Sequence, residues 1–170
     1  NHSRIRMSDG EYCEAEKIIT TIPWNSYQHI TGLPEDLYLA VKRLKHSSIE
    51  TRYVGDTLQT DAQWLYIPDE QKPYHRILIR HNFCQGSRGY WLETRKERVD
   101  MYSDEAQFCY MNEYAYPLNT IDKPQIMQQL LAFTSERQVY GLGRWGEHCH
   151  YNSDVVVDLA MKLSEKICHE

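Results

Sequence analysis

The segment that most constrains the fold runs from Tyr140 to Leu163, where closely spaced glycines separate a short strand pattern from a long helical pattern. The glycines are Gly141, Gly143 and Gly146. Because glycine tolerates backbone conformations and close approaches that other residues do not, this spacing predicts a tight strand–turn–helix connection.

The predicted terminal helix opens on Asn152, Ser153 and Asp154. Asn152 or Ser153 can cap the helix, and Asp154 is favourable in its first turn. The helix start offers free N–H groups and the positive end of a helix dipole, which suit an anionic cofactor. The alternative is a plain connection without a ligand, although Arg144 and Trp145 are poor residues for a simple connector.

Composition narrows the possible partners and compartments. The 170 residues include 24 acidic and 19 basic side chains, a net charge of −5, and no basic run, which argues against nucleic acid. No apolar run reaches the roughly 18–20 residues that a membrane span needs. Five scattered cysteines without a Cys-x-x-Cys pair fit reduced thiols, so we expect a cytoplasmic protein.

The rest of the chain alternates strand and helix patterns. Strands are expected at residues 16–23, 51–58, 64–68, 76–82, 90–96, 107–116 and 138–142. Helices are expected from Pro34, from Asp122 and from about Ser153. The first strand, rich in β-branched residues, is expected to be buried. This order predicts an α+β fold with a mostly antiparallel sheet flanked by helices.

The chain offers no clear catalytic motif, and catalytic residues stay unassigned. His148 and His150 would need a third ligand to hold zinc, so no metal site is predicted. Glu93 and Glu97, four apart on one expected strand, fit a solvated face better than an acid/base pair. The cysteines fit small core residues better than nucleophiles.

Aromatic and basic residues gather on the hairpin expected at residues 64–82. Trp64, Tyr66, His75, Arg76 and Arg80 lie on its two strands. An arginine can clamp a phosphate while an aromatic ring stacks on a base, so the pattern suits a nucleotide diphosphate. Ordinary cross-strand pairing is the alternative.

Four segments together resemble a known family: residues 17–24, 64–69, 75–77 and 143–154. They look like the C-terminal half of the FAD-dependent amine oxidase/protoporphyrinogen oxidase-like flavoproteins. The nearest branch is that of the UDP-galactopyranose mutase-like proteins. The resemblance runs from about residue 10 to about residue 165, and the terminal motif is its most specific part.

The resemblance implies that the chain is a fragment, since the family's N-terminal Gly-x-Gly-x-x-Gly unit, which grips FAD, is absent. Residues 1–23 would be a strand remnant of the FAD-binding domain, and residues 24–137 the substrate-binding domain of an FAD-linked reductase-like fold. Residues 138–170 would be a terminal flavin-facing strand–turn–helix. FAD would belong to the full-length parent, and this chain alone is expected neither to retain it nor to be active.

The comparison, together with the hairpin pattern described above, gives the expected site residues. The implied cofactor-binding residues are Gly143, Arg144, Trp145, Gly146, Asn152, Ser153 and Asp154. The expected substrate-binding residues are Trp64, Tyr66, Arg76, Arg80, His148, His150 and Tyr151. In the mutases, tyrosines of the terminal motif help to hold the substrate diphosphate, and here histidines replace them, which puts the mutase substrate in question.

The leading functional hypothesis is a substrate-side fragment of an FAD-dependent oxidoreductase or nucleotide-sugar mutase, acting in polysaccharide or lipopolysaccharide biosynthesis. Its partners would be a small-molecule substrate and the missing FAD-binding domain, and an exposed apolar face could also drive homodimerisation. One alternative is a non-catalytic α+β module that binds a ligand or partner. Another is a fragment of a flavin amine oxidase.

Overall fold

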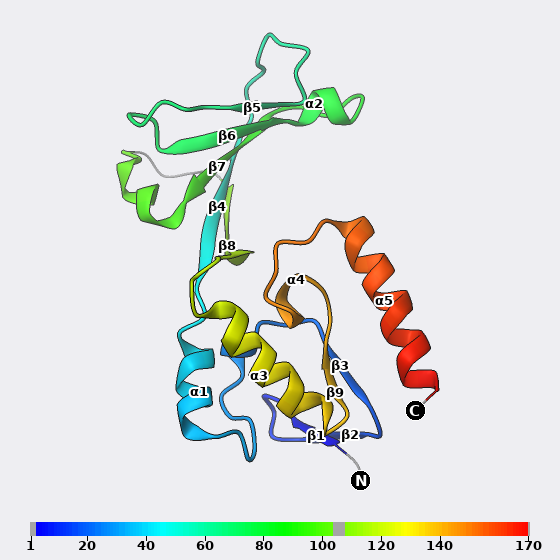
Figure 1. Ribbon diagram of the computed structural model, residues 1–170. Helices are drawn as coiled ribbons and strands as arrows, with labels where there is room; N and C mark the ends of the chain where they lie inside the picture. The colour runs from blue at the N-terminus through cyan, green and yellow to red at the C-terminus, as the bar shows by residue number, and fades with distance from the viewer. Residues whose placement is uncertain (1–2, 104–107, 170) are drawn as a thin grey trace. The chain divides into compact units, whose positions relative to one another are not determined.

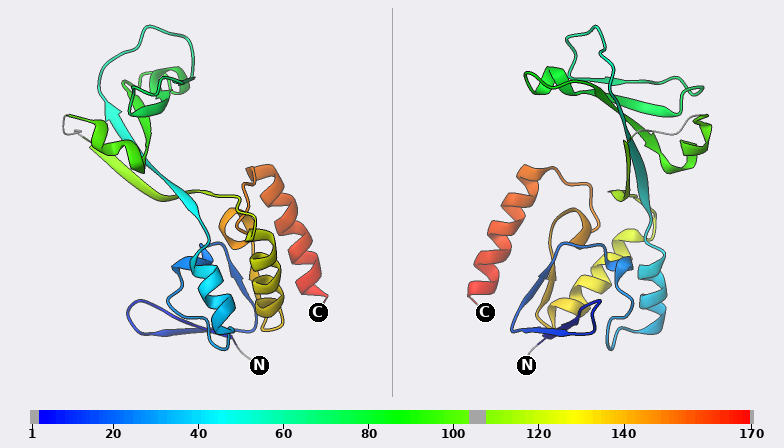
Figure 2. Two further views of the ribbon diagram at one scale, coloured as in Figure 1. Left: turned by 60° about the vertical axis from the view of Figure 1, so that its left-hand side comes forward. Right: turned by 180° about the vertical axis from the view of Figure 1, so that it is seen from behind.

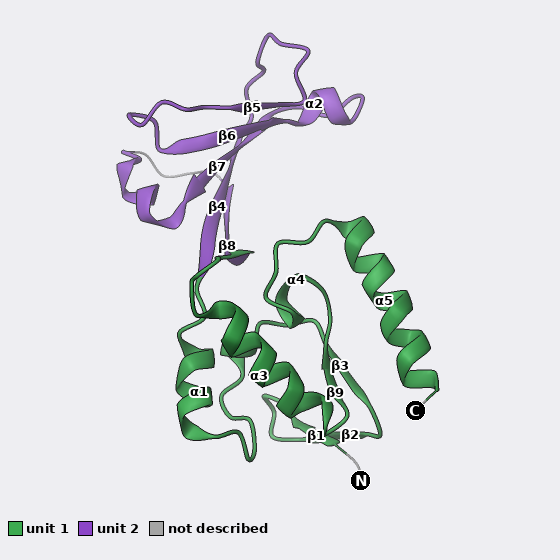
Figure 3. Ribbon diagram, in the orientation of Figure 1, with its two compact units in different colours: residues 1–45, 116–170 green, residues 46–115 purple. Residues whose placement is uncertain are grey.

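The computed structural model describes residues 3–103 and 108–169, which form two compact units (Figure 3). Unit 1 comprises Asn1–Lys45 and Tyr116–Glu170, and unit 2 comprises His46–Ala115. The chain therefore leaves unit 1 once and returns to it. Figures 1 and 2 show the course of the chain through both units.

Unit 1 contains two small sheets and most of the helices. Strands β1 (Ser3–Arg6) and β2 (Tyr12–Ala15) form an antiparallel hairpin, and β3 (Ile18–Thr20) pairs in parallel with β9 (Val139–Gly141). The helices are η1 (Trp24–Ser26), α1 (Glu35–Lys42), α3 (Lys123–Ser135), α4 (Gly143–Gly146) and α5 (Ser153–Cys168).

The core of unit 1 lies where α1 and α3 pack on each other and on η1. Pro34 precedes α1, and the helix buries Leu37 and Val41, which are spaced one turn apart. The buried cluster consists of Trp24, Leu37, Val41, Leu44, Ile126, Met127 and Leu130. The expected helices at Pro34, Asp122 and Ser153 are thus confirmed, with apolar spacing as their common cause.

Unit 2 is built on one five-stranded sheet with the order β5-β6-β7-β4-β8. Its strands are β4 (His46–Val54), β5 (Trp64–Tyr66), β6 (Tyr74–Ile79), β7 (Tyr90–Arg95) and β8 (Phe108–Pro117). The short helices α2 (Arg80–Phe83) and η2 (Lys96–Met101) complete the unit. The pairs β5–β6, β6–β7 and β4–β7 are antiparallel, which confirms the predicted α+β class.

Three strand predictions need correction. The first strand is only Ile18–Thr20 rather than 16–23, and half of Ile19 is exposed, because its parallel sheet has only two strands. The strand expected at 76–82 ends at Ile79, and Arg80–Phe83 turns into a helix. β4 begins at His46, five residues before its predicted start. Gln107 of the predicted strand 107–116 lies outside the described residues.

The three-part division at residues 23 and 137 concerns the domains of a larger protein, and it stays a prediction. The compact units have other bounds, since α1 and α3 share one core in unit 1. Among the described residues, no helix combines the length and apolar character needed to cross a bilayer.

A close backbone contact fixes the terminal turn in unit 1. A Cβ at Gly146 would collide with the Thr20 carbonyl oxygen and lie 2.9 Å from the carbonyl carbon of Gly141. The Trp24 indole donates a buried hydrogen bond of 2.7 Å to the Gly146 carbonyl, and the Leu142 N–H donates to the Thr20 carbonyl oxygen at 2.9 Å. Glycine at 146 therefore allows α4, β3 and β9 to touch.

We expect Gly146→Ala to destabilise the protein by about 1–3 kcal/mol, because backbone atoms rather than a flexible side chain occupy the space of the new methyl group. Urea unfolding measures the change. Gly55→Ala is the control, since its Cβ would only meet Tyr53 at an ordinary 3.9 Å. Equal stabilities of the two variants would contradict the contact.

Candidate functional site

The predicted cofactor residues lie along α4 and at the start of α5, which contact each other. Gly143 and Gly146 are buried, whereas Arg144 and Trp145 are partly exposed. Gly143 has φ +75°, and an added Cβ would lie 3.3 Å from Val156 of α5. The predicted turn is thus a single helical turn pressed against the terminal helix.

The start of α5 is open to a hydrogen-bond acceptor. Asn152 is the N-cap residue, as predicted, and Asp154 lies in the first turn. The Asn152 side chain, however, makes no capping hydrogen bond, so the predicted position of the cap is right and the predicted hydrogen bond is not formed. Asn152, Ser153 and Asp154 are all exposed. The N–H groups of the first turn are therefore not satisfied by the N-cap side chain, which usually accepts from them.

Arg144 organises a cluster around Tyr116. Its Nη2 donates to the Tyr151 carbonyl at 3.0 Å, and its guanidinium lies 5.2 Å from the Tyr116 ring centroid. The His150 ring meets the same tyrosine edge-on, with centroids 4.9 Å apart. The structure thereby brings Arg144, His150 and Tyr151 together. Sequence reasoning missed Tyr116, whose signal was its place at the end of an aromatic strand.

His148 has a different environment from His150. Its side chain is buried, its φ is +48°, and its Nε2 lies 3.0 Å from the Lys45 carbonyl oxygen. Lys123 Nζ donates to the His148 carbonyl at 3.1 Å. In this chain His148 therefore belongs to the packing of unit 1, and the Trp145 ring lies 5.9 Å from it.

Glu147 is a second residue that sequence reasoning missed. Its Oε2 accepts a hydrogen bond from the Gly143 N–H at 3.2 Å, and burial raises the pKa of the carboxyl. Burial, a hydrogen bond with Cys149 and the charge of Glu147 raise the pKa of Tyr151 to about 12. Loss of hydration thus favours the neutral forms of both groups at this turn.

These contacts show how an anionic cofactor would fit. The Gly143 N–H is already paired with Glu147, so it does not face an outside group. The uncapped first turn of α5 and the nearby Arg144 side chain do fit an anion. The fit therefore rests on the helix start rather than on the glycines themselves.

The second predicted group lies in unit 2. Trp64 faces Leu78 across β5 and β6, and Tyr66 faces Arg76, so both aromatic residues and Arg76 share one face of the sheet. Arg80 instead begins α2 and is exposed.

Arg76 already has a partner on that face. Its Nε and Nη2 lie 2.8 and 2.6 Å from Glu93 Oε2 on the neighbouring strand, and its guanidinium is 5.9 Å from the Tyr66 ring centroid. This geometry favours cross-strand pairing over a free phosphate clamp. Glu93 and Glu97 do not share one strand face as predicted, because β7 ends at Arg95 and Glu97 lies in η2.

His75 lies at the irregular position of the β6–β7 pairing, between Tyr74 and Arg76. Burial lowers its pKa, which outweighs the opposing charge of Glu93. Among the described residues, no three His, Cys, Asp or Glu side chains gather closely enough to hold a metal ion.

Comparison with known proteins gives a structural match only. No family model matches the chain, and no curated protein matches it. A solved structure described as reduced UDP-galactopyranose mutase is similar, with a TM-score of 0.64 and 20% sequence identity. The match covers 84% of this chain and 38% of the mutase chain. The two share a mutase-like α+β fold, and this chain matches well under half of that protein's length.

We expect the free energy of unfolding of Glu147→Gln to increase relative to that of the original chain as pH rises above about 4.5, the ordinary pKa of a glutamate. The folded pKa lies above the ordinary 4.5. Between the two values the folded state holds more protons than the unfolded state, so stability falls as pH rises through this window. The glutamine cannot ionise and removes that loss.

Urea unfolding at several pH values checks this expectation, with the exposed Glu136→Gln as control. A stability difference that does not change with pH for Glu147→Gln would show that burial does not perturb this carboxyl.

Proposed function

We propose that this chain is the substrate-side part of an FAD-dependent nucleotide-sugar mutase or oxidoreductase. The observation that carries the proposal is the mutase-like fold, which extends over 84% of the chain. The resemblance of the terminal motif at residues 143–154 supports the same class. Surface-polysaccharide biosynthesis in the cytoplasm is the setting that we propose for it.

The residues of unit 1 would bind and orient the cofactor. The first turn of α5, beginning at Ser153, would donate N–H groups to its anionic part, and Arg144 would add positive charge beside it. The bound flavin would supply nucleophilic or hydride-transfer chemistry toward the substrate. His150 and Tyr151, next to Arg144, would contact the substrate from the same cluster.

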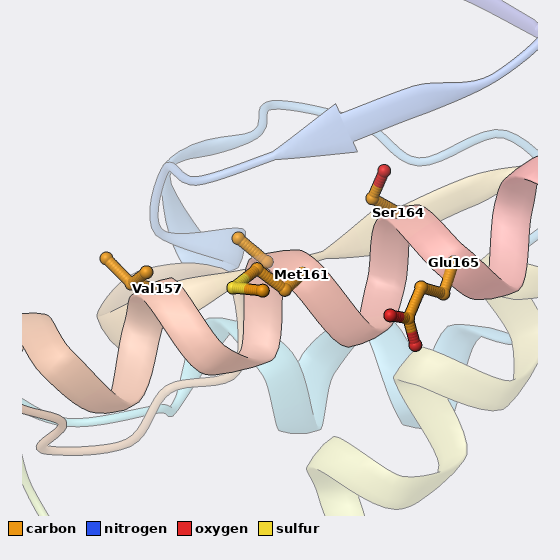
Figure 4. A pocket seen from close by; sticks show the side chains of 5 residues that line it. Val157, Met161, Ser164 and Glu165 are labelled. Atoms are coloured by element: carbon orange, nitrogen blue, oxygen red, sulfur yellow. The ribbon is translucent and has the colours of Figure 1, made fainter.

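Uncovered apolar surface on unit 1 supports a missing flavin-binding domain as partner. α5 has no buried residue, and Val157 and Met161 are 60% and 62% exposed. Figure 4 shows these two side chains with Ser164 and Glu165 along one helix. Ile19 of the parallel pair β3–β9 is also half exposed, whereas parallel sheets are normally covered on both faces. We infer that the remainder of the parent protein covers them.

A binding module without chemistry is the second candidate. The Arg76–Glu93 pair favours it, because the best-placed arginine of the expected substrate face is already neutralised within the sheet.

Expression of this chain together with its upstream coding sequence tests the proposal. The longer protein should purify yellow, with the two visible absorption bands of oxidised flavin, whereas this chain alone should be colourless because one helix start cannot hold FAD by itself. A colourless longer protein, or the absence of upstream coding sequence, would leave the binding module ahead.

Within the longer protein, Met161→Glu should reduce the flavin bound per protein, because a charge would enter the surface that the flavin domain covers. Flavin content after gel filtration measures it. Lys162→Ala is the matched control, since Lys162 is exposed and its ion pair is with Asp158 one turn away on the same helix. Equal flavin content in both variants would contradict the proposed covering of α5.

A further inference from the structure

The two faces of the unit 2 sheet differ in character. One face carries the core: Ile77 pairs with Leu92, and both are buried together with Ile79. The opposite face carries Trp64 and Tyr66 of β5, and it continues through Leu78 to Trp91. Since side chains alternate along a strand, the aromatic residues contribute nothing to the core on the other side.

Three aromatic rings lie half in water at the β5 end of this face. Trp64 is 50% exposed, Phe83 of α2 is 51% exposed, and Tyr66 is 67% exposed. The Trp64 and Phe83 rings stack, with centroids 6.2 Å apart and planes inclined by 19°. Trp64 and Tyr66 are two positions apart, which separates them by about 7 Å along the strand. A grouped set of exposed rings is the kind of patch that marks an interaction site.

One arginine and one glutamate beside the rings form an ion pair. Arg76, opposite Tyr66, joins Glu93 through two contacts to one carboxylate oxygen, Oε2. The pair itself adds no net charge to the face, and its guanidinium and carboxylate, 25% and 13% exposed, are hydrogen-bonding groups beside the rings. Charge complementarity therefore favours a neutral, hydroxyl-rich ligand over a diphosphate.

We propose that the face formed by Trp64, Tyr66 and Phe83 binds a neutral saccharide. The apolar C–H side of a sugar ring lies flat on the aromatic rings, and its hydroxyls hydrogen-bond to Arg76 and Glu93. A peptide strand fits less well, because β5 at the sheet edge has only three residues to pair with. This site needs no cofactor, so its failure would leave the proposed flavin chemistry standing.

Titration of this chain with neutral malto- and galacto-oligosaccharides, followed by tryptophan fluorescence, tests the site. We expect saturable binding with a Kd of roughly 0.1–1 mM, the range expected for a shallow surface site. Trp64→Ala should weaken binding at least about tenfold, and Trp64→Phe should retain most of it because a ring remains. Calorimetric titration confirms the values where the fluorescence of Trp64 is lost.

Two further variants separate this site from its alternatives. Tyr12→Ala removes a tyrosine that is 60% exposed in unit 1, and it should leave saccharide binding unchanged. Arg80→Ala should also leave it unchanged, whereas binding of a nucleoside diphosphate through Arg80 would be lost. Thermal unfolding of each variant shows whether it is folded.

Several results would overturn the proposal. They are no saccharide binding up to about 10 mM by the folded chain, unchanged binding in Trp64→Ala, or binding of uridine diphosphate alone that depends on Arg80. Dimerisation that protects Trp64 from a soluble quencher would assign the face to a second copy of the chain instead.

Discussion

The contact of Gly146 with Thr20 and Gly141 is the constraint on which unit 1 depends. Two segments far apart in sequence, β3 and the β9–α4 turn, meet there without side chains between them, and the Trp24 indole closes the contact by donating to the Gly146 carbonyl. The position of α4 follows from this contact. The position of Arg144 follows in turn, because it occupies the same helical turn and reaches Tyr151 and Tyr116.

Local pattern was enough to predict most elements, because helices and strands here follow their own apolar periodicity. The helices near Pro34, Asp122 and Ser153 and the β5–β6 hairpin are where the sequence placed them. The errors concern features that depend on contacts between elements distant in sequence. The burial of Ile19 depends on how many strands join β3, and no pattern within residues 16–23 contains that information.

The candidate site shows the same limit more sharply. The glycines and the helix start were visible in sequence, but the partner of Gly143 is Glu147, and Arg144 turns to Tyr116, a residue on another segment. His148 and His150 are two residues apart and chemically identical, yet one is buried against Lys45 and the other is exposed beside Tyr116. A positive φ at His148 redirects the chain there, and residue type alone does not reveal it.

Pairing of charges also decides what each surface can bind. An arginine in a sequence counts as a free cation until its partner is known, and the antiparallel register places Glu93 directly opposite Arg76. Arg76 and Glu93 together form a neutral pair. The residue types alone predict a site for a diphosphate, whereas the pairing favours a ligand with hydroxyl groups. In unit 1 the charged groups are arranged differently: burial favours the neutral form of Glu147, while the Arg144 guanidinium donates to a backbone carbonyl. We therefore place the proposed anionic cofactor group at the terminal turn rather than on the sheet.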